Sequence, residues 1–200
     1  MSTSPQTLSV QDRQCVAAWA ADCAEHVLSI FELAVPDDIG VRDAIGLTRS
    51  FASGDLDVAE AIRCRGGGAG ASAREAPTPA ATAAAYAAEQ AAAVAHMGAH
   101  ALGAAGYAAK ASTLAADPDG GDLTRSGALR QAAAMSDAVA RALVLLPPLG
   151  ENSAGPLGPG RLSSGDVGQA IRVIQAHLRA RDGVSVIEHR AGSLPDRRST

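Results

Sequence analysis

The sequence predicts an all-α fold: a compact helical bundle of about five helices, then a Pro- and Gly-rich linker and a short C-terminal helix. Three observations support this. Alanine, which has the highest helix propensity, is abundant, whereas aromatic residues make up only 2% of the chain. Apolar residues recur in steps of three and four, and Ser, Thr or Asp stands where these periodic segments begin. We therefore expect a helical domain over 1–146, a flexible linker over 147–162, and a short helical extension with a disordered tail over 163–200.

The first helix is expected to begin at Ser9, which opens a capping box. Its apolar stripe includes Trp19, which we expect to anchor the core, and Pro36 ends the helix. A second helix follows over about 39–53, with Gly54 as its C-terminal stop.

A glycine-rich stretch interrupts the third helix, which is expected to begin at Asp57. The segment from Gly66 to Gly70 has four glycines in five positions, and each costs a helix about 1 kcal/mol relative to alanine. We expect a break or a mobile loop there. A Gly-rich loop can also hold phosphate, but no strand precedes this one and no Gly-Lys-Ser/Thr follows it.

The strongest predicted helix runs without interruption over 79–116, with Thr78 as its N-cap. Further helices are expected over about 126–146 and 164–181, the last ending at Gly183. The segment VSVIEHR is expected to add one short strand, and the final LPDRRST to be disordered.

The long polar side chains of the 79–116 helix recur in steps of three and four, so they form one stripe. With Tyr86, Ala93 and Gly103 filling the intervening steps, the stripe comprises Glu89, His96, His100, Tyr107 and Lys110. His96 and His100 at i and i+4 can place two imidazoles near one point, the spacing used for a divalent metal such as zinc or for proton transfer. The HExxH motif is absent, so a site needs side chains from another helix; if the first helix packs alongside, Asp22, Glu25 or His26 are its candidates. In the alternative interpretation both histidines hydrogen-bond within a helix interface or lie at the surface.

The opposite side of the same helix is a seam of small residues that allows another helix to approach closely. It consists of Ala91, Ala95, Gly98, Leu102, Gly106 and Ala109. One hypothesis that follows is a structural helical module that forms a homodimer through Gly98 and Gly106.

The charge distribution favours a protein partner with a basic surface. The formal net charge of −4 argues against a nucleic-acid-binding protein, which usually carries a basic patch. Residues 1–60 hold ten acidic residues against three arginines. Such a surface steers a basic partner; alternatively, it is the solvated exterior of the helices.

The remaining sequence features argue against secretion, a membrane span and a known catalytic motif. The N-terminal segment lacks the basic and apolar regions of a signal peptide. The apolar run over 91–116 is mostly Ala and Gly and contains three ionisable residues, which does not fit a membrane span. The three cysteines have no CxxC spacing, as is typical of a reducing cytoplasm. No GxSxG, Rossmann, Walker or EF-hand pattern is present.

Two segments carry a resemblance to a known family. The stretch VAAWAADCAEHVLSIFELAVPDD, followed after a Gly-rich interval by AEQAAAVAHMGAHALGAAGYAAKA, resembles the alanine-rich putative immunity proteins of actinobacteria, the immunity-five-like group. The likeness covers about residues 10–115, and the chain beyond about Leu146 looks unlike the family. The resemblance implies a compact helical domain that inhibits a co-encoded toxin in the producing cell by covering the toxin's active surface.

The leading hypothesis is therefore an immunity or antitoxin-like protein that binds a cognate toxin in the cytoplasm, without a cofactor. Its candidate contacts are Asp22, Glu25, Glu32, Asp37 and Asp38. A small metal-dependent or acid–base enzyme built on His96 and His100 is the second hypothesis, and the homodimerisation module is the third.

Overall fold

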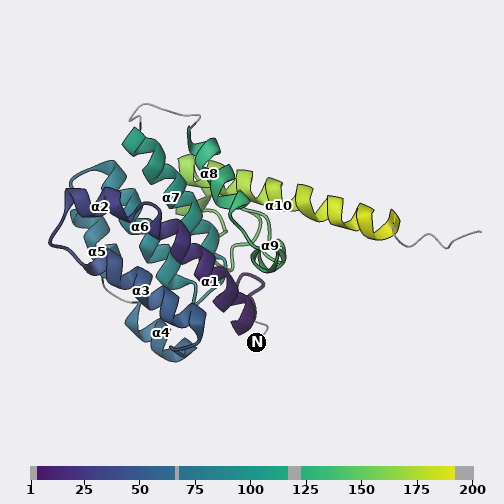
Figure 1. Cartoon of the computed structure of the whole chain (residues 1–200), viewed down its shortest axis with the longest axis horizontal. Helices are drawn as coiled ribbons and strands as arrows, with labels where there is room; N and C mark the ends of the chain where they lie inside the picture. The colour runs from purple at the N-terminus through teal and green to yellow at the C-terminus, as the bar shows by residue number, and fades with distance from the viewer. Residues whose placement is uncertain (1–3, 66–67, 117–122, 192–200) are drawn as a thin grey trace, which may run out of the picture.

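The computed structural model describes residues 4–65, 68–116 and 123–191, and for 182–191 the backbone alone. Within these ranges every regular element is helical, which confirms the all-α class (Figure 1). The helices are α1 (Val10–Glu25), α2 (Leu28–Ala34), α3 (Gly40–Ser53), α4 (Val58–Cys64), α5 (Gly68–Glu75), α6 (Pro79–Ala93), α7 (His100–Ala116), α8 (Leu123–Ala133), α9 (Asp137–Val144), the 3₁₀ helix η1 (Arg161–Ser163) and α10 (Gly165–Ala191). They outnumber the expected five because several predicted helices are divided. None of the helices searched in the described ranges has the length and hydropathy to span a membrane.

The predicted helix boundaries are confirmed where a local cap defines them. The side chains of Ser9, Asp57 and Thr78 each accept a hydrogen bond from a backbone N–H in the first turn of α1, α4 and α6. Gly54 follows α3 with φ of 84°, the left-handed conformation of a helix C-terminus. The expectations that rest on short-range chemistry therefore hold.

The core is built around α6 and α7, which pack most extensively on each other. Helices α1, α2, α3 and α5 cover α6, while α8 and α10 pack on α7 (Figure 1). Most buried side chains of the central pair are alanines, which permit close helix approach but bury little area each. Trp19 adds a large anchor, as expected: it is buried, and its Nε1–H donates to the carbonyl of Gln131 at 3.1 Å.

The prediction of one uninterrupted helix over 79–116 is wrong, because the chain leaves the helical path between α6 and α7. In a continuous helix the N–H groups of Gly98 and Ala99 would donate to carbonyls four residues earlier. They donate instead to Thr7 and Gln6 of the N-terminal segment, both at 3.0 Å. The carbonyls of Val94 and Ala95 therefore lose these helical donors, and the carbonyl of Ala95 accepts a hydrogen bond from the Arg13 guanidinium instead.

The seam predicted for a homodimer is occupied within the chain. A Cβ on Gly98 would lie 2.5 Å from the side chain of Leu8. A Cβ on Gly106 would lie 3.0 Å from Val167 and 3.2 Å from Ile171, both on α10. The small residues thus admit segments of the same protein, and the hypothesis of dimerisation through this seam is wrong.

Three further expectations need correction. The first helix divides at Val27 into α1 and α2, and the expected 126–146 helix divides where Ser136 caps α9. The last helix passes through the expected stop at Gly183 and continues to Ala191, so VSVIEHR is helical and not a strand. Helix α4 ends at Cys64 and α5 begins at Gly68, so Gly68 and Gly70 of the expected break are helical. Residues 66–67 and the segment LPDRRST lie outside the described ranges.

The segment expected to be a linker contacts the helical body. Leu157 is fully buried, and its N–H donates to the side chain of Gln6 at 2.8 Å. The Gln6 amide in turn donates to the carbonyl of Asn152 at 2.8 Å. The division into domains at 146 and 162 stays a prediction, but these contacts tie the N-terminal segment to the region after α9.

Candidate functional site

The acidic side chains predicted to face a partner lie on α1, α2 and the turn before α3, where several already have partners. Arg49 of α3 forms ion pairs with Asp22, at 2.9 Å, and with Glu25. Arg42 pairs with Glu32. Two guanidinium groups therefore offset part of the negative charge of this surface. All three ion pairs are solvent-accessible, and such a pair contributes about 0–1 kcal/mol to stability.

The turn between α2 and α3 retains acidic and apolar groups together. Asp37 is exposed and forms no ion pair in the described part of the chain, while Asp38 accepts from the N–H of Gly40 at 2.8 Å. Leu33 is 87% exposed and Ile39 is 65% exposed, one on each side of this turn. Sequence reasoning missed both, although Leu33 falls outside the apolar stripe of its helix. In the chain Leu33 directly follows Glu32 and Ile39 directly follows Asp38, so each exposed apolar side chain has an acidic neighbour in sequence.

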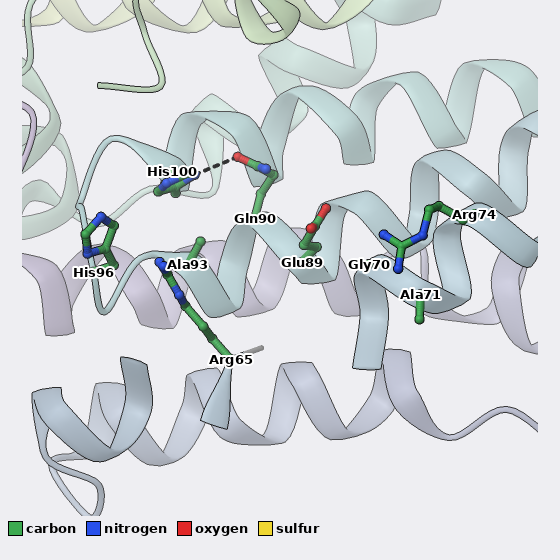
Figure 2. A pocket seen from close by; sticks show the side chains of 9 residues that line it. All are labelled: Arg65, Gly70, Ala71, Arg74, Glu89, Gln90, Ala93, His96 and His100. Carbon is green, nitrogen blue, oxygen red and sulfur yellow. Dashed lines mark hydrogen bonds between the residues drawn. The ribbon is translucent and has the colours of Figure 1, made fainter. Parts of the chain in front are cut away.

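A pocket of about 610 Å³ collects part of the predicted polar stripe. It is lined by Arg65, Gly70, Ala71, Arg74, Glu89, Gln90, Ala93, His96 and His100, from the end of α4, from α5 and α6, from the break before α7 and from the first residue of α7 (Figure 2). His96 and His100 therefore do meet, but across the break and not along one helical face. In Figure 2 the two imidazoles and Arg65 lie toward one end, and Glu89 and Arg74 toward the other.

Both imidazoles of the pocket are held in the neutral form near pH 7. The Nδ1 of His100 is 2.8 Å from the Gln90 side-chain oxygen; because that oxygen only accepts, Nδ1 carries the proton. Burial lowers the pKa of His100 to about 4, with smaller effects from His96 and Arg65. Burial also lowers the pKa of His96, and the positive charges of Arg65 and Arg13 lower it further.

Comparison with known protein families identifies the family to which the region containing these features belongs. The family model of the Imm-5 like putative immunity protein matches residues 6–138. The chain belongs to this family. No curated protein and no solved structure matches it.

The matched region of this Imm-5 like protein is longer than the expected 10–115. It extends through α8 into α9, and it contains the acidic surface and every residue that lines the 610 Å³ pocket. The helix η1 and the whole of α10 follow the match.

Tyr107 and Lys110 of the predicted stripe lie in a second pocket of the Imm-5 like protein, of about 490 Å³. The ring of Tyr107 is 5.2 Å from that of Tyr86, and the Arg161 guanidinium lies 5.6 Å above the Tyr86 ring. The amine of Lys110 is 3.8 Å from a carboxylate oxygen of Asp166. Arg161 lines this pocket and Asp166 pairs with its Lys110, and both lie outside the predicted stripe, so sequence periodicity did not reveal either contribution.

The donor set needed for a metal does not assemble in the described ranges. No group of three or more His, Cys, Asp or Glu side chains there could hold a metal ion. Asp22 and Glu25 point to Arg49, and neither they nor His26 line the pocket that holds His96 and His100. The predicted convergence of the first helix on the two histidines is therefore wrong.

Proposed function

We propose that this protein binds and neutralises a toxin encoded beside its gene, acting in the cytoplasm of the producing cell. Membership of the Imm-5 like family supports an immunity role. The observation that carries the choice of surface is the exposure of Leu33 and Ile39 at the acidic α2–α3 turn.

The partner expected for this surface has an apolar patch surrounded by Lys and Arg. The five predicted carboxylates carry a formal −5, and Arg42 and Arg49 reduce it to −3. Apolar side chains near the centre of an interface supply affinity once water is excluded, while charges at its edge speed association and select the partner. The proposal assigns the first role to Leu33 and Ile39 and the second to Glu32 and Asp37.

The test measures binding of the protein to the toxin and protection of the host cell. The protein and the product of the neighbouring toxin gene are co-expressed, their affinity is measured, and the survival of the host cells is scored. Leu33→Asp and Ile39→Asp are expected to weaken binding about thirtyfold or more, the loss of a central contact worth about 2 kcal/mol. Increasing the salt concentration is expected to slow association, since edge charges act over about a Debye length.

Leu145→Asp is the matched control. Leu145 is also an exposed leucine, 62% accessible, and it follows α9 on the other side of the molecule from α2 (Figure 1). Loss of protection with Leu33→Asp but not with Leu145→Asp supports the proposal. Equal affinity of the two variants refutes the surface, and an inert neighbouring gene product refutes the function.

A further inference from the structure

The pocket beside His96 is shaped by residues with little or no side chain. Gly70, Ala71 and Ala93 contribute lining between the longer polar groups. Gly70 leaves room for a carboxylate in particular, because a Cβ there would lie 2.7 Å from an oxygen of Glu89. A space of about 610 Å³ is within the range of sites that take small molecules.

The positive charges of the pocket are not matched by carboxylates of the described chain. Arg65 and Arg74 form no ion pair within those ranges, and neither does Glu89, the one acidic residue of the lining. Arg63, in the last turn of α4 and two positions before Arg65, does pair with Glu60. The lining therefore carries a formal charge of +1 when both histidines are neutral.

A second guanidinium adds to the positive potential around His96. Arg13 is buried, its Nη1 donates to the carbonyl of Ala95, and its Nε has no hydrogen-bond partner within the described ranges. Buried charges are normally paired, because leaving water costs several kcal/mol per ion. Neither Arg13 nor Arg65 forms an ion pair within the described ranges, and after burial their positive charges are the causes that lower the pKa of His96.

We propose that this pocket binds a small molecule through an oxyanion, a carboxylate or a phosphate, seated between Arg65 and the imidazoles of His96 and His100. A guanidinium offers two parallel N–H donors that match such a group. The anion would also favour protonation of the imidazoles, each of which then gains a donor. Further along the pocket, the Glu89 carboxylate is available to accept hydrogen bonds from the rest of the ligand and the Gln90 amide nitrogen to donate them.

This site is independent of the proposed toxin-binding surface, because neither Leu33 nor Ile39 lines it. The experiment uses the full chain with ¹⁵N-labelled histidine side chains. Sodium phosphate and sodium acetate are titrated separately against sodium chloride, at pH 7 and constant ionic strength. His26 is the internal reference, since it is exposed and outside the pocket.

We expect saturable shifts at His96 and His100 and none at His26. Arg65→Gln is expected to weaken binding about tenfold or more, as loss of a charge-assisted hydrogen bond does. Arg63→Gln removes the same charge two positions earlier in the chain, outside the pocket, so it should stay within about twofold. Arg74→Gln repeats the comparison if Arg65→Gln does not fold.

Saturation by both anions indicates a carboxylate or phosphate ligand, and saturation by phosphate alone indicates a phosphate ester. Linear shifts of equal size at all three histidines overturn the proposal. Equal affinities of Arg65→Gln and Arg63→Gln, with Arg74→Gln also unaffected, overturn it as well.

Discussion

Truncation of Gln6 tests whether one buried amide joins the N-terminal segment to the region after α9. The side chain is fully buried; it donates to the Asn152 carbonyl and accepts from the Leu157 N–H, each at 2.8 Å. Gln6→Ala removes both bonds and leaves two backbone groups without partners. A buried polar group left unsatisfied costs about 1–3 kcal/mol. We expect the free energy of unfolding to fall by about 2–4 kcal/mol, allowing for partial entry of water.

The assay is urea unfolding followed by circular dichroism, with amide hydrogen exchange at Leu157 as a local readout. Gln11→Ala is the control, because Gln11 is an exposed residue of α1 and its replacement should stay within about 0.5 kcal/mol. Protection of the Leu157 amide should fall in Gln6→Ala and persist in Gln11→Ala. Equal stability of the two variants, with Leu157 protected in both, would refute the reasoning.

Two further predictions concern α7. Gly106→Ala should lower the free energy of unfolding by about 1–3 kcal/mol without changing the elution volume on size exclusion, because the new methyl group would lie 3.0 Å from Val167 of α10. For His100, the folded pKa of about 4 is below the ordinary 6.5, so its contribution to stability is complete above pH 6.5 and is lost as the pH falls toward 4. The loss should approach about 3 kcal/mol in urea titrations of the wild type and be absent in His100→Gln, and parallel pH profiles would contradict it.

The features predictable from the sequence are those decided within a few residues. Ser9, Asp57 and Thr78 cap their helices because a short side chain reaches the next turn, whatever the rest of the chain does. The apolar stripe with Trp19 likewise defines the buried face of α1. The family resemblance also depended on local segments of sequence, and it is confirmed over a longer range.

The helix break before α7 could not be predicted in the same way, because its cause lies about ninety positions away. Alanine, Val94 and Met97 are all compatible with a helix, and Gly98 alone is a weak signal. The break forms because Gln6 and Thr7 accept the hydrogen bonds that helix carbonyls would otherwise receive. The polar residues do recur in steps of three and four in the sequence, but they do not form one stripe, because the helix ends at Ala93 and a second helix begins at His100.

Ion pairs between the acidic side chains and other helices could not be predicted from the sequence either. Counting charges identified the excess of carboxylates in residues 1–60 but not their distribution. Arg49, on a different helix, pairs with both Asp22 and Glu25. Leu33 became a candidate only when its exposure was known.

The break between α6 and α7, which the sequence did not predict, is also what makes the histidine pocket possible. On a continuous helix His96 and His100 would share one face with Ala93 and Gly103, and no other segment would fix their rings. At the break, Gln90 orients the His100 ring, and the backbone carbonyl of Gln6 accepts from Ala99, the residue before it. The Gln6 side chain also bonds the segment after α9, so a segment outside the family match is joined through Gln6 to the break that carries the two histidines.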